Sequence, residues 1–281
     1  MSVLKPDELN LWSRYIYSLC GVQIDGSKGY LVETRLGPLM RETGCSSFTE
    51  LYHKAKSDGS NGLKKKIIDS ITTNETSFFR DASPFELLQH KILPDLIDKR
   101  AKAPGAGRAL PIRIWSAACS TGQEVYTTAV VLKELLVDLT RYDIRILGTD
   151  ISDKAVAHAS YAKYTKLELD RGMTPAKVAK YFVAEGQVWK VRDEIRALAT
   201  FKMMNLLEPF SFPQKFDIVL CRNVAIYFSE PDKARLFKAI SRVMAPDGYL
   251  IIGSTETITG LCPEFEPKRY LRSVFYQLKG A

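Results

Sequence analysis

Two short polar segments of this chain could hold a small ligand at the edge of a sheet. The first, Ala117–Gly122, reads AACSTG and separates an apolar run from an amphipathic one. Its small side chains would let a ligand approach the backbone, and a helix starting after it would offer free N–H groups to a carboxylate. The second ends at Asp150, whose carboxylate could accept hydrogen bonds from both hydroxyls of a ribose.

The glycine patterns of phosphate-binding loops are missing, because the first segment is not GxGxxG and GxxxxGK[ST] does not occur. A dinucleotide or nucleoside triphosphate is therefore disfavoured relative to a nucleoside that carries an amino acid, such as S-adenosylmethionine. Glu124 could meet the amino group of the methionine part, although the helix dipole alone also favours a carboxylate there. Asp150 could instead cap the next helix, but Ser152 suits that role better.

Alternating strand and helix patterns predict an α/β fold with a parallel sheet built from βαβ units. The predicted strands are 112–116, 144–149, 200–204, 216–221, 249–253 and 269–278, and the predicted helices are 122–139, one opening at Ser152, and 231–244. Ligands of such sheets bind outside the carboxyl ends of the strands, which is where both polar segments fall. An irregular segment at about 160–200 is interpreted as a small insertion.

The first 85 residues are predicted to be helical. Apolar residues recur there at helical spacing, for example Leu9, Trp12, Ile16 and Leu19. The stretch KAPGAGRALP at 102–111 is rich in Gly, Pro and Ala and indicates a loop after a helix that ends near Arg100. The architecture is therefore expected to change there.

The composition excludes several classes of protein. The hydrophobic share of 46% and the charged share of 26% are ordinary for globular proteins. No apolar run approaches the roughly 20 residues of a bilayer span, and the first ten residues lack the apolar part of a signal peptide, so we expect a cytoplasmic protein without membrane insertion. Five scattered cysteines and three distant histidines show no CxxC or HExxH spacing, so neither a disulfide framework nor a metal site is expected.

Three segments resemble, in order and across nearly the whole chain, the CheR family of chemoreceptor glutamate methyltransferases. They are Thr72–Arg80 (TTNETSFFR), Trp115–Glu124 (WSAACSTGQE) and Cys221–Phe228 (CRNVAIYF). The resemblance implies an N-terminal all-helical domain at 1–85 and a class I, Rossmann-like S-adenosylmethionine-dependent methyltransferase domain at 86–281. A small β-subdomain would be inserted in it at about 160–200.

The resemblance also implies a set of residues around the cofactor: Asn74, Thr76, Arg80, Glu124, Asp150, Asn205, Leu206, Arg222 and Asn223. Without it, Asn74 and Thr76 would be interpreted as helix caps and Asn205 as a strand-end turn. Arg80 and Tyr227 are expected to shape the methyl-transfer site, because a guanidinium can hold a carboxylate and a phenol can donate one more hydrogen bond. Taken singly, a Tyr in an IYF run is usually a core residue and a lone Arg a surface charge.

The implied reaction methylates glutamate side chains on the cytoplasmic helices of chemoreceptors, for adaptation in chemotaxis or a related sensory pathway. A glutamate oxygen would displace the sulfonium methyl in one step, giving a methyl ester and S-adenosylhomocysteine. A free glutamate has a pKa of about 4.3, so the nucleophile is already ionised and needs no general base. Catalysis would then consist mainly of alignment and of removing water from the carboxylate.

Two departures from the family pattern bear on partners. Glu124–Thr127 reads EVYT where many members have EPYS, which is tolerable at a helix start. Glu185–Val188 looks shorter than the glycine-containing loop of members that grip a receptor's C-terminal pentapeptide, so no such tether is expected. Lys28 and Arg35 are seven residues apart and share a helix face, which is expected to meet the receptor's methylated helices, whereas Arg41 falls elsewhere.

The net charge of +8 at pH 7 leaves other functions open. The basic excess lies beyond residue 90 and could serve a nucleic-acid methyltransferase. The chain lacks the [DN]PP[YF] motif and an aromatic-and-basic RNA-binding module, so no nucleic-acid partner is expected, and the run Lys64–Lys66 is more typical of a solvated helix face. A third interpretation is a non-catalytic sensor of S-adenosylmethionine. We expect a monomer.

Overall fold

The computed structural model of the chain describes residues 4–101 and 109–280, so most of the loop predicted at 102–111 lies outside the described residues. The N-terminal part is formed by α1 (Pro6–Cys20), α2 (Gly29–Glu42), α3 (Phe48–Ser57) and α4 (Gly62–Ile71), with a short 3-10 turn, η1 (Gly26–Lys28), before α2. Trp12, Ile16 and Leu36 are fully buried in a core of their own between these helices. The helical spacing of apolar residues in the sequence thus corresponds to real helices.

The end of α1 is fixed by a glycine. Gly21 adopts a left-handed conformation with φ +70°, and a Cβ there would lie 2.0 Å from a methyl carbon of Leu207. Its N–H closes the helix on the carbonyl of Tyr17. The turn that ends α1 therefore also lets the helical part approach the rest of the chain closely.

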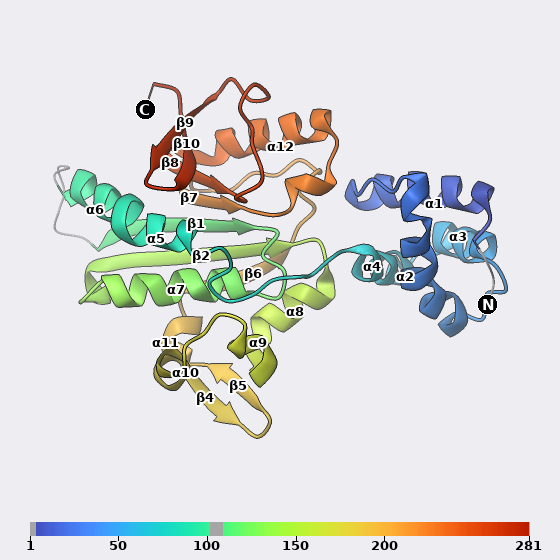
Figure 1. The fold of residues 1–281 in the computed structure, drawn as a ribbon, viewed down its shortest axis with the longest axis horizontal. Coiled ribbons are helices and arrows are strands. Elements are labelled where there is room, and N and C mark those ends of the chain that lie inside the picture. The colour runs from blue at the N-terminus through green and yellow to red at the C-terminus, as the bar shows by residue number, and fades with distance from the viewer. Residues whose placement is uncertain (1–3, 102–108, 281) are drawn as a thin grey trace.

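The rest of the chain is built on a seven-stranded sheet with the order β6-β2-β1-β7-β8-β10-β9 (Figure 1). The strands are β1 (Leu110–Ala117), β2 (Tyr142–Asp150), β6 (Ala199–Met203), β7 (Phe216–Cys221), β8 (Met244–Ile252), β9 (Phe265–Tyr270) and β10 (Ser273–Leu278). The strands from β6 to β8 in this order run parallel, and β10 and β9 are antiparallel. Ala117 pairs with both Thr149 and Cys221, so the carboxyl ends of the three central strands are aligned.

Alternate residues of the central strands enter two apolar cores, one on each face of the sheet. Ile114 packs with α7 (Gln123–Leu135) and with the continuous helical run of α5 (Ser83–Leu87), η2 (Leu88–Ile92) and α6 (Leu93–Ala101). Trp115, the next residue, packs on the opposite face with α12 (Glu230–Val243). The fold is the predicted α/β class with a mostly parallel sheet.

The prediction of one final strand over 269–278 is wrong. Two antiparallel strands, β9 and β10, form a hairpin whose turn contains Leu271 and Arg272, with Leu271 at φ +50°. Alternation of apolar residues continues across this turn, and the turn carries none of the Gly, Asn or Pro residues that usually indicate one. The helix predicted over 122–139 is also too long, because α7 ends at Leu135 and a separate 3-10 turn, η3 (Leu139–Arg141), precedes β2.

A small subdomain leaves the sheet after α8 (Asp153–Tyr161) and returns before β6 (Figure 1). It contains an antiparallel sheet in the order β3-β5-β4 and three short helices. Its elements are β3 (Lys163–Thr165), α9 (Lys166–Asp170), α10 (Pro175–Tyr181), β4 (Phe182–Glu185), β5 (Val188–Val191) and α11 (Asp193–Arg196). We call residues 163–196 the inserted β-subdomain. None of the helices in the described part of the chain has the length and apolar character of a bilayer span.

Candidate active site

The loop after β1 has an unusual backbone. Ala118 and Ser120 have φ of +63° and +51°, and Gly122 follows at +94° as the N-cap of α7. Non-glycine residues in this region are strained and are often found at functional sites. Cys119 N–H donates to the carbonyl of Thr149 at 2.8 Å, which ties the loop to the end of β2. The strain therefore turns this loop toward the carboxyl end of the sheet.

Asp150 is buried at the end of β2 and holds two backbone segments together. Its carboxylate accepts hydrogen bonds from Ser120 N at 2.8 Å and from Ser152 N at 3.0 Å. Burial raises the pKa of Asp150, and these hydrogen bonds offset only part of the shift. The cap of α8 is provided by Ser152, whose Oγ accepts from Ala155 N at 3.0 Å. The alternative interpretation of Asp150 as the helix cap is therefore wrong.

The segment 72–80, between α4 and α5, crosses the same end of the sheet without forming a helix. The residue-only interpretation of Asn74 and Thr76 as helix caps is wrong, since the next helix, α5, has Ala82 at its N-cap. Ser120 Oγ donates to the carbonyl of Asn74 at 3.0 Å. Phe79 N–H donates to Thr127 Oγ1 of α7 at 3.2 Å. The segment is thus held against both the loop after β1 and the helix that follows it.

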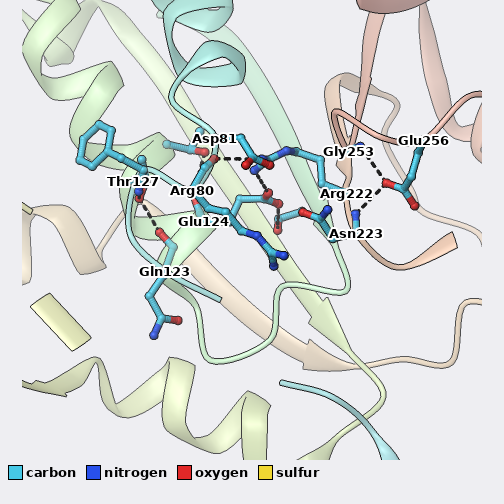
Figure 2. A network of polar contacts seen from close by, with 12 residues as sticks. Arg80, Asp81, Gln123, Glu124, Thr127, Arg222, Asn223, Gly253 and Glu256 are labelled. Carbon is cyan, nitrogen blue, oxygen red and sulfur yellow. Dashed lines mark hydrogen bonds and ion pairs between the residues drawn. The ribbon is translucent and has the colours of Figure 1, made fainter. Parts of the chain in front are cut away.

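Arg222, directly after β7, joins the two sides of this arrangement (Figure 2). Its buried guanidinium pairs with Glu124 at 2.8 Å and with Asp81 at 3.0 Å, and it donates to the carbonyl of Arg80 at 2.9 Å. Glu124 also accepts from Ser116 Oγ at 2.7 Å. Because a buried charge is costly unless it is paired, this network fixes the start of α7 relative to Arg80.

Glu256, in the loop after β8, organises the neighbouring turn and was not predicted from the sequence. Its carboxylate accepts from Asn223 N at 2.7 Å, from Gly253 N at 2.8 Å and from Ile226 N at 3.2 Å, the first two of which are drawn in Figure 2. A Cβ on Gly253 would lie 2.4 Å from that carboxylate, so a side chain there would displace Glu256 from these hydrogen bonds. An acidic residue just after a strand end is the signal that could have identified Glu256.

The helical part forms the opposite wall. Asn205 donates from Nδ2 to the carbonyl of Leu19 at 3.1 Å, and its Oδ1 accepts from Leu207 N at 3.1 Å, so it does form a turn after β6. Gln23 N–H donates to the carbonyl of Tyr227 at 3.4 Å. Tyr227 lies in the 3-10 turn η4 (Ala225–Tyr227). These contacts bring the end of α1 against the loops after β6 and β7.

All of the sequence-predicted site residues line one cleft between these parts. They are Asn74, Thr76, Arg80, Glu124, Asp150, Asn205, Leu206, Arg222, Asn223 and Tyr227. The cleft is also lined by residues of the helical part that the sequence did not place there, among them Val22, Ile24 and Leu31. Lys28 and Arg35, predicted only as a surface for a partner, border it as well. The cleft thus has the carboxylates of Asp150 and Glu124 at the sheet edge, the latter paired with Arg222, and the cations Lys28 and Arg35 on the helical side, which we call the cationic wall.

Metal and thiol chemistry find no support in the described residues. Among residues 4–101 and 109–280, no group of three or more His, Cys, Asp or Glu side chains could hold a metal ion. All five cysteines are free and buried. Burial raises the pKa of Cys119, which lines the cleft, so its thiol is a poor nucleophile.

Comparisons with known proteins agree with this geometry. Residues 7–72 match the family model of the CheR methyltransferase all-alpha domain, and residues 74–270 match that of the CheR methyltransferase SAM binding domain. Chemotaxis protein methyltransferase 1 of Pseudomonas aeruginosa is 35% identical over 99% of this chain and 100% of its own length. The protein of the same name from Vibrio cholerae is 35% identical over 98% of both chains, and chemotaxis protein methyltransferase Cher2 of Pseudomonas putida is 34% identical over 94% and 95%.

Proposed function

Since the chain belongs to the CheR methyltransferase family, we propose that its cleft binds S-adenosylmethionine and transfers the methyl group to glutamate side chains of chemoreceptors in chemotaxis. The products are glutamate methyl esters and S-adenosylhomocysteine. The observation that carries the proposal is the convergence of three motif segments on one cleft at the carboxyl ends of β1, β2 and β7. The enzyme is a protein-glutamate O-methyltransferase.

The polar groups of the cleft suit the polar parts of S-adenosylmethionine. Asp150 would accept hydrogen bonds from the ribose hydroxyls, and Glu124 would attract the amino group. Arg80 borders the same space, and its guanidinium is left for the carboxylate of the acceptor. Asn74, Thr76 and Asn223 border the same space, with Asn205 and Leu206 near the turn after β6. When bound, the cofactor supplies the methyl group. The sulfonium sulfur that carries this methyl group leaves as a neutral thioether. The guanidinium of Arg222 is already bound to Glu124 and to the carbonyl of Arg80, so Arg222 holds Glu124 in place.

The chain's own contribution to the reaction is to orient and desolvate the acceptor. A glutamate is ionised at neutral pH, since its free pKa is about 4.3, and therefore no general base is needed. Arg80 and Tyr227 hold the acceptor carboxylate in one pose, and the α1 end and η4 close the cleft from the side. Alignment and the removal of water then lower the barrier.

The cationic wall gives the substrate its direction of approach. Arg35 donates to the carbonyl of Ile71 and, at 3.0 Å, to Thr73 Oγ1, and Lys28 pairs with Asp25 at 3.0 Å. Both side chains border the cleft, where they attract an acidic helix of the receptor. Arg35→Glu is expected to raise the KM for receptor by a larger factor than the Kd for S-adenosylhomocysteine, since Arg35 borders the cleft and also bonds to Thr73; equal methylation rates for the variant and the wild type would contradict this contact.

The organisation and remaining partners belong to the same proposal. We divide the chain into a helical domain at 1–85 and a methyltransferase domain at 86–281 with the insertion at about 160–200, and the separate core of α1–α4 supports this division. The enzyme acts as a cytoplasmic monomer on receptor helices, without a nucleic-acid partner.

The β4–β5 hairpin turns at once through Gly186, at φ +63°, and offers no long loop for a receptor pentapeptide. Calorimetric detection of micromolar pentapeptide binding would refute the missing tether.

One assay separates this function from its two competitors. Purified protein is incubated with methyl-labelled S-adenosylmethionine and either receptor cytoplasmic fragments or bulk RNA, and mass spectrometry locates any added methyl. A base-labile methyl on receptor glutamates supports the proposal. Label in RNA would identify a nucleic-acid methyltransferase, and tight S-adenosylhomocysteine binding without any turnover would identify a sensor. Absence of binding in calorimetry would refute all three.

A further inference from the structure

At Gly172, the backbone of the inserted β-subdomain lies directly against the backbone of the segment 72–80. Gly172, in the loop between α9 and α10, has φ +150°. A Cβ built on it would lie 1.8 Å from the carbonyl oxygen of Phe78, which no side chain can tolerate. The subdomain and the segment are therefore in direct backbone contact beside the cleft.

The side chain of Phe78 extends this contact into the core of the subdomain. It is 1% exposed and packs edge-on against the rings of Tyr164 and Phe182, with ring centroids 4.9 Å and 5.6 Å away. Phe78 stands two residues before Arg80 in the chain. The backbone that carries Arg80 is thus anchored in the inserted β-subdomain as well as in the main sheet.

An ion pair extends the anchoring to the Arg80 side chain itself. Arg171, next to Gly172, pairs with the carboxylate of Glu75. The carbonyl of Glu75 accepts a hydrogen bond from the Arg80 guanidinium at 2.9 Å. The pose of the guanidinium therefore depends on a residue whose side chain is held by the subdomain.

Tyr164 makes a second contact, to the loop after β1. Its hydroxyl donates to the carbonyl of Thr121 at 2.7 Å, in the loop after β1. The next residue, Gly122, has no room for a side chain, because a Cβ would lie 2.9 Å from Ala159 Cβ and 3.0 Å from the Tyr164 hydroxyl. One fully buried ring thus contacts both Phe78 and the loop expected to hold the cofactor.

We propose that Arg171 and Tyr164 are positioning residues of the methyl-transfer site, so that the inserted β-subdomain sets the pose of Arg80 and the shape of the loop after β1. The inference rests on the proposed function of that site. Arg171 acts through Glu75 and Tyr164 acts through Thr121, and neither of them lines the cleft.

The Arg171 arm is tested by steady-state kinetics of the full-length protein on a receptor fragment. Arg171→Met is expected to lower kcat about twofold to fivefold, which is the most that the loss of one exposed ion pair can change the population of a single Arg80 pose, and to leave the KM for S-adenosylmethionine nearly unchanged. Arg171→Lys, which keeps the charge, restores most of the rate. The melting temperature should change little, because the side chains of the pair are 48% and 58% exposed and exposed pairs contribute little to stability.

A matched control comes from a neighbouring ion pair of the same subdomain. Lys166 and Asp170 of α9 are paired at 2.7 Å and are also exposed, yet neither of them contacts the segment 72–80 through an ion pair or hydrogen bond in the described structure. Asp170→Asn should leave kcat at the wild-type value. An equal loss in Asp170→Asn and Arg171→Met, or a wild-type kcat in Arg171→Met, overturns the Arg171 assignment.

The Tyr164 arm is read by binding alone and so does not depend on turnover. Tyr164→Phe keeps the ring and removes one hydrogen bond, which should weaken S-adenosylhomocysteine binding about three- to tenfold in calorimetry. Tyr126→Phe is the control, because its hydroxyl donates at 2.8 Å to the carbonyl of Ala159 in α8 instead. It should lower the melting temperature similarly without changing affinity.

The two arms keep the failure of this inference apart from the failure of the proposed function. A wild-type protein that binds S-adenosylhomocysteine but methylates no receptor refutes the proposed function, and the Tyr164 arm then decides the inference by itself. Unchanged affinity in Tyr164→Phe overturns the assignment of Tyr164 whether or not methyl transfer is found.

Discussion

Glu8 in the helical part and Asp150 at the sheet edge are both buried carboxylates that accept backbone hydrogen bonds, yet their pKa values shift in opposite directions. Glu8 accepts from Lys5 N at 3.0 Å and from the N–H and hydroxyl of Thr49 at 2.9 Å each. Burial raises the pKa of Glu8, but these hydrogen bonds outweigh it and the net shift is downward. In Asp150, burial has a larger effect on the pKa than the hydrogen bonds do, and the net shift is upward.

Under the proposed function, this difference distinguishes a carboxylate that stabilises the fold from one that would bind a ligand. The ionised form of Glu8 is fully compensated by its own protein partners. The ionised form of Asp150 is under-compensated, so its contribution to stability is present below its ordinary pKa and is lost as the pH rises through its raised value. A ligand that donates two hydroxyl groups would supply the missing compensation. Such uncompensated groups in clefts are typical of functional sites.

The strongest test of the comparison replaces Asp150. Asp150→Ala is expected to weaken S-adenosylhomocysteine binding about 100-fold or more, since two hydrogen bonds to a charged acceptor contribute about 1.5–3 kcal/mol each. Calorimetry measures the change, with Asp150→Asn as a second variant that keeps one acceptor for the loop. Ser152→Ala removes the cap of α8 and the hydrogen bond from Ser152 Oγ to Asp69 but keeps the Asp150 carboxylate, so it serves as the control and should bind normally. Wild-type affinity for S-adenosylhomocysteine in Asp150→Ala would contradict the distinction between Asp150 and Glu8.

The pH dependence of S-adenosylhomocysteine binding tests the comparison between Asp150 and Glu8 further. If the ionised Asp150 binds the ligand, as we propose, then its pKa, raised by burial, predicts that S-adenosylhomocysteine affinity falls as the pH is lowered through that value, by at most about tenfold per pH unit. Calorimetry between acidic and neutral pH follows this. The slope should vanish in Asp150→Asn, and a slope that persists there would assign the titration to another group.

Glu256 is an intermediate case. It accepts three backbone N–H groups like a structural carboxylate, but the turn that it holds contains Asn223 and precedes Tyr227. Glu256→Gln should weaken S-adenosylhomocysteine binding about three- to tenfold, the effect of losing part of one hydrogen-bond network. Thermal unfolding measured beside calorimetry decides its class: a lower melting temperature with normal affinity would group Glu256 with Glu8.

The smallest effect on ligand binding is expected for Glu8→Gln. The free energy of unfolding at pH 7 should fall by about 1–2 kcal/mol, because an ionised acceptor of three hydrogen bonds is replaced by a neutral one. Since the pKa of Glu8 is lowered from 4.5, its contribution is present above that value and is lost as the pH falls through the folded-state value. Denaturant unfolding should therefore show the two proteins converging in acid. Weaker cofactor binding by folded Glu8→Gln would contradict the assignment of Glu8 to the fold alone.

Local patterns were sufficient to predict the strand ends that carry the site. The alternating order of strand and helix segments placed β1, β2 and β7, and the cap at Ser152 was evident from residue type. The hairpin turn at Leu271 and Arg272 was missed because neither residue type favours a turn; the φ of +50° at Leu271 accompanies the pairing of β9 with β10 on either side of it. Single-position propensities therefore fail where the surrounding structure dictates the backbone.

The parts of the site that depend on long-range contacts could not be found this way. Asn74 and Thr76 have the residue types of helix caps, and only the family resemblance identified them as cleft residues. Val22 and Ile24 look like ordinary core residues, and Glu256 is 33 positions away from the Asn223 N–H that it accepts from. Their roles arise from packing between elements distant in sequence.

Gly172 limits how this scaffold can be re-engineered. Chimeras that exchange the inserted β-subdomain for that of another family member must retain glycine at this position, because any side chain would collide with the carbonyl oxygen of Phe78. A graft with alanine there would displace the segment 72–80, which carries Arg80. Exchange should therefore include both Phe78 and Gly172 as a fixed pair.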